Sequence, residues 1–548
     1  MSSNFWADQV AKEIVDREQK LNRVSKFRTE MGLGASGIPH VGSTGDGIRS
    51  FVVNLALKEL GVKSEFIAFS DDRDGLRKVP VGFPVAESEI GKPVSAIDDP
   101  FGCHKNMALH IGQLLTDAFD RLGVQFRLLR AHEEYAKGTL DKQIIIALKN
   151  AKRCGEIIRE VTGQDKYIAQ LPYMAVCEKC GKIYTTRAYR FADGEIHYKC
   201  DQTFEGKNSN TGKIIEVKGC GHDGVCGLRD GKLAWKVEFA ARWAALNINY
   251  EAFGKDILDS VRCNDRISKE IFSWEPPIHS FYELFTERSG KKISKSAGNV
   301  FTPARWMKYA SPLSLRLLFL KRLGTSRVVD PDAIPAYMDE VDELEKIYFR
   351  EKQGFSGTQK DQSLSRVGKV KTANQKELEH QKRLFEFVNF LETPSESKVI
   401  VQYNMLANLM RIAKNQDVVK SILKRTGHVP QQLNEMDKEE LTARISYVTN
   451  WINDTVPEEK IVYALSDEQK KSIKKLIYEL ENKDWEEEEL YARLYAIPKE
   501  DGLEMGKFFE ATYVLLLNSL RGPRLAQFIC AIGCEKAAAI LKNRMNEF

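Results

Sequence analysis

The sequence predicts an α/β fold in the amino-terminal half of the chain, a small cysteine-bearing insertion within that half, and an all-α fold in the carboxyl-terminal half. A strand–helix–strand pattern begins near residue 23, five of the ten cysteines fall between Cys177 and Cys226, and almost only helical patterns follow residue 330. A chain of 548 residues is too long for one hydrophobic core, so we expect about two to four domains of roughly 100–200 residues each.

The amino-terminal half opens with a βαβ unit. Residues 23–31 and 64–69 are predicted strands, and residues 46–60 carry apolar side chains at helical spacing. In a Rossmann-like fold, the turn between the first strand and its helix presents backbone N–H groups to phosphates. We therefore expect functional residues in the glycine-rich turn of this unit.

The insertion is predicted from a change of composition between residues 173 and 230, where short strand-like pieces, turns and cysteines replace the earlier pattern. Strands and helices return afterwards and end in a basic loop. The α/β domain is thus divided into a first part, 1–172, and a second part, 231–328.

Four cysteines of the insertion have the paired spacing of a structural zinc site: Cys177, Cys180, Cys200 and Cys220. Four protein ligands close a tetrahedron and leave no position for water, so we predict that Zn²⁺ holds the insertion together. His197, His222 and Cys226 are possible additional ligands, and the alternative is a set of reduced buried cysteines. The other cysteines are expected to be buried as small apolar residues.

The carboxyl-terminal domain, residues 329–548, is predicted to be helical. Helical spacing of apolar residues recurs over 332–349, 437–452, 466–480 and 506–520. A polar stretch with few aromatic residues, 355–381, predicts a linker or mobile loop.

Composition limits the possible partners and the location. The 82 basic residues nearly balance the 77 acidic ones, so a net charge of +5 does not indicate nucleic-acid binding by itself, and any RNA-binding surface must be local. No apolar run approaches the ~18 residues of a membrane span, and the amino-terminal segment resembles an amphipathic helix rather than a signal peptide. We expect a cytoplasmic protein with no membrane partner.

Two segments carry the candidate chemistry. The first is the turn 34–43, GASGIPHVGS, whose small residues allow close approach of a phosphate to which His40 can donate a hydrogen bond. The second is the loop 290–299, GKKISKSAGN, whose lysines can act as point charges on a departing polyphosphate. Taken alone, the glycine-rich turn is typical of a loop that only begins a helix. The basic loop alone is typical of a solvated charged surface.

Together and in this order, His40-Val41-Gly42-Ser43 and Lys292-Ile293-Ser294-Lys295-Ser296 resemble the HIGH and KMSKS motifs of class I aminoacyl-tRNA synthetases. The segments 70–80 and 234–256 and the helical half are similar to the archaeal type of class I lysyl-tRNA synthetase. The resemblance is close in the catalytic region. In the helical half the resemblance is limited to general character, apart from the segment Gly522-Pro523-Arg524-Leu525.

The resemblance implies a Rossmann-like catalytic domain with a zinc-binding insertion and an all-α anticodon-binding domain. It also implies formation of lysyl-adenylate from L-lysine and ATP with Mg²⁺, followed by transfer to tRNA(Lys). Phosphoryl chemistry of this kind needs positioning and charge neutralisation more than a nucleophilic side chain. The implied catalytic residues are His40, Ser43, Lys292 and Lys295, and the implied ATP-binding residues are Gly37, His40, Gly42, Lys292, Ser294 and Lys295.

The same resemblance assigns Asp46 to the ammonium group of the substrate, which a carboxylate attracts. An acid in the first helical turn is otherwise explained by the helix dipole. The other implied substrate-binding residues are Gly32, Gly34, Trp235 and Tyr282, although such aromatic residues more often belong to the core. Ile257 follows Asp256 where many family members have histidine, which removes one expected hydrogen bond to the substrate.

Three other functions remain open from the sequence. A class I synthetase for another amino acid such as glutamate would need a cationic pocket, which Asp46 disfavours. A small-molecule nucleotidyltransferase would not need the long helical half. A zinc-containing RNA-binding protein without adenylation activity would not need His40 and the two lysines of the basic loop. The acidic run Asp71, Asp72 and Asp74 could bind Mg²⁺ or ribose, or could simply be solvated.

Overall fold

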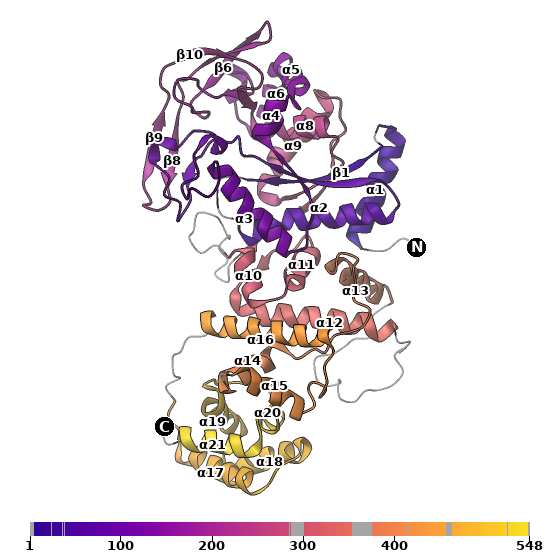
Figure 1. Cartoon of the computed structure of the whole chain (residues 1–548), viewed down its shortest axis with the longest axis vertical. Helices are drawn as coiled ribbons and strands as arrows, with labels where there is room; N and C mark the ends of the chain where they lie inside the picture. The colour runs from indigo at the N-terminus through magenta and orange to yellow at the C-terminus, as the bar shows by residue number, and fades with distance from the viewer. Residues whose placement is uncertain are drawn as a thin grey trace. The chain divides into compact units, whose positions relative to one another are not determined.

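The computed structural model describes residues 5–23, 25–34, 37, 39–283, 285–286, 301–352, 375–413, 415–455, 463–522 and 524–545 (Figure 1). The chain forms two compact units. The first comprises Met1–Trp306, Leu315–Asp330 and Arg350–Thr393, and the second comprises Met307–Ser314, Pro331–Phe349 and Pro394–Phe548. Within the described residues, every helix is too short or too polar to cross a bilayer.

The first unit is built on a five-stranded parallel sheet with the strand order β13-β12-β1-β2-β4. Its strands are β1 (Phe27–Leu33), β2 (Ser64–Ser70), β4 (Arg127–Arg130), β12 (Tyr250–Gly254) and β13 (Ile278–Tyr282). The chain builds outwards from β1 to β2 and β4, and later returns to the other side of β1 with β12. Such a reversal opens a crevice at the carboxyl ends of the strands, where ligands of α/β proteins bind.

Helices cover both faces of this sheet. Figure 1 shows α1 (Trp6–Leu21), α2 (Val41–Glu59) and α3 (Met107–Arg121) on one side, and α8 (Trp235–Leu246) and α9 (Leu258–Glu270) on the other. Because both faces are covered, the central strands are buried, as expected for a parallel sheet. The predicted Rossmann-like α/β fold is therefore confirmed.

The first βαβ unit differs from its prediction only at its boundaries. Strand β1 begins at Phe27, and α2 begins at Val41, before the predicted helix start. The glycine-rich turn itself supplies this first helical turn, in which the hydroxyl of Thr44 donates to the carbonyl oxygen of Val41 at 2.8 Å and the side chain of Val41 is fully buried. Burial of Val41 offsets the low helix propensity of its glycine neighbours.

Short helices link β4 to the insertion, which the chain enters and leaves through an antiparallel strand pair. These helices are α4 (Ala131–Lys137), α5 (Asp141–Lys149), α6 (Ala151–Thr162) and α7 (Lys166–Ala169), and the pair is β5 (Tyr173–Ala175) with β11 (Gly231–Leu233). Beyond it lie the antiparallel strands β6 (Arg187–Ala192), β7 (Glu195–Lys199) and β10 (Asp223–Cys226). A second small sheet joins β3 (Lys78–Val79), β8 (Thr203–Asn208) and β9 (Ile214–Lys218), so the insertion also pairs with the segment after β2.

The second unit is helical, as predicted. Its long helices are α12 (Ile334–Lys352), α14 (Tyr403–Ala413), α15 (Gln416–Arg425), α16 (Glu435–Thr455), α17 (Asp467–Asn482), α18 (Glu487–Glu500), α19 (Met505–Leu517), α20 (Leu525–Ile532) and α21 (Cys534–Met545). The helices α10 (Pro303–Tyr309) and α11 (Pro312–Leu320) contribute residues to both units, and the strands β14 (Phe285–Thr286) and β15 (Arg327–Val328) pair within the first unit.

The predicted linker over 355–381 is wrong in its last part. Residues 353–374 lie outside the described residues, but α13 (Gln375–Val388) begins at Gln375. Its Phe387 stacks on Phe5 at 4.9 Å between ring centroids, and Arg383 donates to both carboxylate oxygens of Asp8. The first turns of α13 are polar and exposed and its apolar face begins at Leu384, so its helical period is not visible before that residue.

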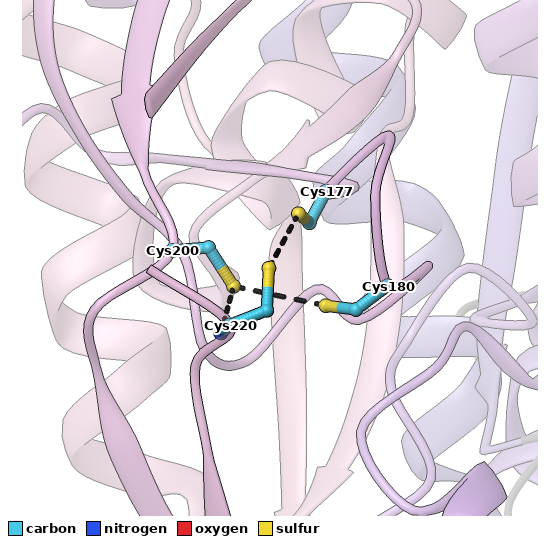
Figure 2. A group of neighbouring side chains, drawn as sticks. All are labelled: Cys177, Cys180, Cys200 and Cys220. Atoms are coloured by element: carbon cyan, nitrogen blue, oxygen red, sulfur yellow. Dashed lines mark hydrogen bonds between the residues drawn. The ribbon is translucent and has the colours of Figure 1, made fainter. Parts of the chain in front are cut away.

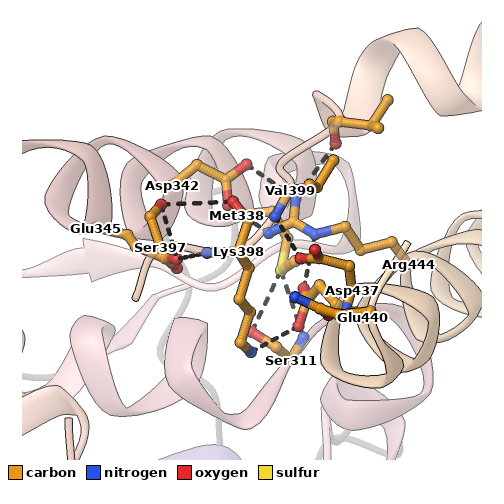
Figure 3. Close-up of polar contacts among 12 residues, drawn as sticks. Ser311, Met338, Asp342, Glu345, Ser397, Lys398, Val399, Asp437, Glu440 and Arg444 are labelled. Atoms are coloured by element: carbon orange, nitrogen blue, oxygen red, sulfur yellow. Dashed lines mark hydrogen bonds and ion pairs between the residues drawn. The ribbon is translucent and has the colours of Figure 1, made fainter. Parts of the chain in front are cut away.

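A buried ionic cluster joins α12 and α16 in the second unit (Figure 3). The guanidinium of Arg444 is ion-paired with Asp342 and donates to Glu440 at 2.7 Å, and all three side chains are largely buried. Lys398 pairs with the same Glu440 at 2.8 Å, and its backbone N–H donates to Glu345. The cluster thus connects the two helices with the segment that precedes α14.

Replacing Asp342 by asparagine is expected to lower the free energy of unfolding of the second unit by about 1–3 kcal/mol, because one charge-assisted pair is lost while Glu440 still faces Arg444. Calorimetry of the full chain measures the change. The control is Glu435→Gln at the start of α16, where an exposed pair with Lys438 contributes about 0–0.5 kcal/mol. Equal shifts for the two variants would contradict the prediction.

Candidate active site and metal centres

The predicted substrate-binding residues lie where the parallel strands end. Gly32 and Gly34 lie at the end of β1, Tyr282 closes β13, and Asp46 lies in the first turns of α2. These residues come from distant parts of the sequence, and the shared edge of the sheet gathers them.

A buried ionic cluster lies beside this edge of the sheet. Arg242 of α8 is fully buried and pairs with Glu30 at 2.5 Å, with Asp71 at 3.2 Å and with Glu251 at 3.5 Å. Burial raises the pKa of Asp71 to about 7, against the opposing effect of Arg242. A side chain at Gly32 would meet this cluster at 3.8–3.9 Å, so Gly32 places the backbone directly beside it. The cluster connects β1 and β12 with the residue that follows β2.

The acidic run after β2 is not solvated. Asp71 faces Arg242, the carboxylate of Asp72 contacts His132 at 2.6 Å, and Asp74 pairs with the buried Lys232. The carboxylates are therefore occupied inside the protein, and these contacts give no support to a Mg²⁺ or ribose site.

Asp46 and Tyr282 form one site. The hydroxyl of Tyr282 donates to the carboxylate of Asp46, and the guanidinium of Arg49 lies 3.9 Å from the centre of the Tyr282 ring. Asp256 lies beside them, since a side chain at Gly254 would meet its carboxylate at 2.7 Å and the Tyr282 hydroxyl at 3.5 Å.

The electrostatics of this site favour a cation. Burial raises the pKa of Asp46 well above its usual range, Arg49 opposes this shift, and Glu251 and Asp256 add to it. Among the charged groups that shift this pKa, the two carboxylates of Glu251 and Asp256 outnumber the guanidinium of Arg49. A positive group placed against Asp46 would stabilise its ionised form, whereas a carboxylate would be repelled.

His40 is held at the start of α2 by the absence of a side chain at Gly42. A Cβ at Gly42 would lie 2.8 Å from Cε1 and 2.9 Å from Nδ1 of His40, far inside van der Waals contact. The pattern His-x-Gly therefore has a steric reason: the glycine leaves the space that the imidazole ring fills.

Replacing Gly42 by alanine is expected to displace the His40 ring and to lower kcat of ATP–pyrophosphate exchange about 100-fold, because small misplacements of positioning groups have effects of this size. The control is Gly112→Ala in α3, where an added Cβ meets nothing within 4 Å. An unchanged kcat in the Gly42 variant would show that His40 tolerates the shift.

Residues on both sides of the basic loop 290–299 contact the glycine-rich turn at the start of α2. The backbone N–H of Val41 donates to the carbonyl oxygen of Phe301 at 2.9 Å, just after the loop, and Phe285, just before it, lies 4.0 Å from a Cβ at Gly42. Lys292, Ser294 and Lys295 lie outside the described residues, as does the side chain of Ser43.

Gly37 and Trp235 line a different part of the site. They border an open cleft of about 1040 Å³ between the sheet edge and the insertion, with Thr302 and residues of β8. Four basic side chains face this cleft: Arg77, Lys78, Lys166 and Lys236. His40, Asp46 and Tyr282 are not among its lining residues, so the predicted residues divide between a small acidic site and a wide basic cleft. Ile257 packs against the core.

The four predicted zinc ligands come together in the insertion. The sulfur atoms of Cys177, Cys180, Cys200 and Cys220 all lie within 4.8 Å of one another, and two pairs approach to 3.6 and 3.7 Å (Figure 2). Zn–S bonds of ~2.3 Å in a tetrahedron place sulfurs about 3.8 Å apart, so the arrangement fits Zn²⁺.

The other candidate ligands of the insertion have different contacts. The imidazole of His222 lies 2.6 Å from the carboxylate of Glu178, and the ring of His197 packs near Tyr189. The group of four sulfurs does not include Cys226, which is half-buried at the end of β10.

A second group of side chains that could hold a metal ion was missed from the sequence. Asp99, Cys103, His104 and His110 place their ligand atoms within 4.8 Å of one another before and within the first turn of α3. Cys103 lies 3.1 Å from His104 and 3.2 Å from His110, and the ring of Phe101 stacks on His110 at 4.8 Å. The expectation that the cysteines outside the insertion are buried as small apolar residues is wrong for Cys103, which is exposed. The spacing Asp-x₃-Cys-His-x₅-His was the available signal, since His110 turns back towards the loop from the helix.

Comparisons with known proteins agree with this geometry. The family described as tRNA synthetases class I (K) matches residues 4–374, and the anticodon binding domain matches residues 439–545. A lysine-tRNA ligase of Cenarchaeum symbiosum (strain A) is 39% identical over 98% of this chain and 98% of its own length, and one of Archaeoglobus fulgidus is 29% identical over 97% and 98%. The chain therefore belongs to the class I lysyl-tRNA synthetases.

Proposed function

We propose that this protein activates L-lysine with ATP and transfers it to tRNA(Lys). The assignment of lysine as the substrate rests on the acidic site formed by Asp46, Tyr282 and Asp256, which lies beside the turn that holds His40. The ammonium group of lysine would lie against Asp46, and a glutamate side chain would meet the carboxylates of Asp46 and Asp256 instead. We expect the enzyme to act in the cytoplasm, where ATP and tRNA are present.

In the activation step, the carboxylate of lysine attacks the α-phosphorus of ATP, a new C–O–P bond forms, and pyrophosphate leaves with its Mg²⁺. His40 would hold the phosphates at the start of α2, where backbone N–H groups and the helix dipole favour anions. Lys292 and Lys295 would neutralise the charge that grows on pyrophosphate. Transfer of the aminoacyl group to a ribose hydroxyl at the tRNA end then releases AMP.

The wide basic cleft is suited to the tRNA end. Arg77, Lys78, Lys166 and Lys236 can neutralise phosphates of a single strand that approaches the sheet edge from the side of the insertion. The helical unit would read the unpaired anticodon bases.

Zinc is proposed at both clusters of the first unit. The four cysteines fit a closed structural site, and the mixed set of Asp99, Cys103, His104 and His110 has the ligand types of a second one. Neither ion takes part in the reaction steps above.

The test is amino-acid-dependent ATP–pyrophosphate exchange with the full chain, in which each amino acid is supplied separately with and without bulk tRNA. Exchange with lysine alone is the expected result. Exchange with a different amino acid would retain the class I reaction and refute the lysine assignment. Absence of exchange, even with tRNA, would favour an RNA-binding protein without adenylation activity.

A further inference from the structure

A buried arginine of α2 lies behind the acidic site. Arg49 follows Asp46 by three residues and is only 3% exposed, whereas Asp46 remains partly exposed. Side chains of a helix lean towards its amino terminus, so residues three and four positions apart meet. The guanidinium of Arg49 accordingly extends back to Gly45 and stacks on the ring of Tyr282, 3.9 Å from its centre. The ring of Phe319 lies 5.6 Å from the same guanidinium.

Gly45 provides the space that this guanidinium fills. A Cβ at residue 45 would lie 2.8 Å from Nη1 of Arg49 and 3.2 Å from the ring of Phe319. Glycine is unfavourable inside a helix, so a glycine at this position has a cost that the packing of Arg49 explains. The role of Gly45 towards Arg49 therefore resembles that of Gly42 towards His40.

The charge balance at Asp46 depends on Arg49. Burial raises the pKa of Asp46 well above its usual range, Arg49 opposes this shift, and Glu251 and Asp256 add to it. Burial also raises the pKa of Tyr250, which lies close enough to sense both Arg49 and Asp46, so its hydroxyl stays neutral. Among the described groups that shift the pKa of Asp46, Arg49 is the one cation.

We propose that Arg49 is a positioning residue for the substrate lysine: its guanidinium holds the Tyr282 ring against Asp46 and balances the surrounding carboxylates, which favours the ionised form of Asp46. The proposal rests on the proposed function and adds a residue that is itself too buried to contact the substrate. The hydroxyl of Tyr282 donates to Asp46, so a ring that is fixed by the stack also fixes this donor. The partly exposed carboxylate of Asp46 stays accessible to the substrate ammonium.

The test is the pH dependence of the KM for lysine in pyrophosphate exchange by the full chain. Arg49→Met keeps a long side chain and removes the charge. We expect its KM for lysine to rise about 10-fold at neutral pH, and the pH at which this KM levels off to move upwards, because Asp46 loses the cation that favours its ionised form. The KM for ATP should stay unchanged.

Arg49→Lys separates the charge from the stack. Lysine restores the positive charge but lacks the flat guanidinium that lies on the Tyr282 ring. The pH dependence should therefore return to that of the unmodified protein, while the KM for lysine rises about threefold at every pH.

The matched control is Arg316→Met in α11. The guanidinium of Arg316 stacks on the ring of Phe390 at the same 3.9 Å and donates to the carbonyl oxygens of Leu122 and Val388. This variant should lose stability and keep the pH dependence of the KM for lysine, so it shows what the loss of a stacked arginine does away from the acidic site.

If Arg49→Met fails to fold, Gly45→Ala tests the same point, because the new Cβ displaces the guanidinium. It should move the pH dependence in the same direction. An unchanged pH dependence in either variant, or an Arg49→Lys variant that does not restore it, would overturn the proposal. Lysine-dependent exchange by the unmodified protein tests the proposed function separately, so failure of this inference remains distinguishable from failure of that function.

Discussion

Replacing Cys200 by serine is expected to remove one zinc ion per chain and to unfold the insertion while the parallel sheet stays folded. The four sulfurs lie within 4.8 Å of one another, and Cys200 ends β7 while Cys177 and Cys180 precede β6. The ion would therefore join the two ends of this small sheet. Structural zinc sites contribute about 10–16 kcal/mol of binding free energy in small domains, more than so few strands can supply by packing.

Metal analysis of the purified chain and limited proteolysis between residues 173 and 230 measure the two effects. The matched control is His222→Ala, a neighbouring residue that contacts Glu178 instead of the sulfurs and should keep its zinc. His110→Ala should remove an ion from the second cluster and leave the insertion resistant to protease. A Cys200 variant with full zinc content and unchanged proteolysis would refute the structural role.

The architecture was largely predictable because its signals are local. A strand or helix shows its period within a few residues, so β1, α2 and β2 could be placed, with errors at the start of β1 and where the glycine-rich turn becomes helical at Val41. The first cysteine pair is likewise a local pattern. Cys200 and Cys220 could be added because thiolates have few other uses in such a spacing.

The residues that escaped prediction depend on contacts between distant segments. The sequence does not indicate that Glu30, Asp71 and Glu251 will converge on Arg242, because three separate segments supply those carboxylates: β1, the residue after β2, and β12. The acidic run after β2 was difficult to interpret for the same reason: its cationic partners lie far away in the chain.

The role of Asp46 in the acidic site depends on evidence from both the sequence and the structure. The sequence motif places Asp46 in the first turns of α2, where an acid could serve only the helix dipole. The structure places the predicted Tyr282 and also Asp256 beside it, and burial raises the pKa of Asp46. An acid needed for the dipole alone would be more favourable if it were exposed and ionised, so these surroundings favour a role in cation binding.

Replacing Asp46 by asparagine is accordingly expected to lower kcat/KM for lysine in pyrophosphate exchange by about 10²- to 10⁴-fold. The estimate follows from the loss of one partner of a largely buried ion pair, about 3–5 kcal/mol at 1.4 kcal/mol per tenfold change. The KM for ATP should stay unchanged, and Tyr282→Phe, which removes only the hydroxyl donor, should lose about tenfold. If Asp46 serves only the helix, the variant would keep its lysine kinetics and lose about 0.3–1 kcal/mol of stability.

The pH dependence of the KM for lysine tests the same role of Asp46 independently. Lysine carries its ammonium proton throughout the neutral range, and the raised pKa of Asp46 means that the carboxylate of the free enzyme must lose a proton before it can pair with that group. The KM for lysine should therefore fall as the pH rises through this pKa and level off above it. In the Asp46→Asn variant no such proton exists, and the dependence should disappear. A pH dependence that persists in the variant would assign it to another group and would remove Asp46 from the binding step.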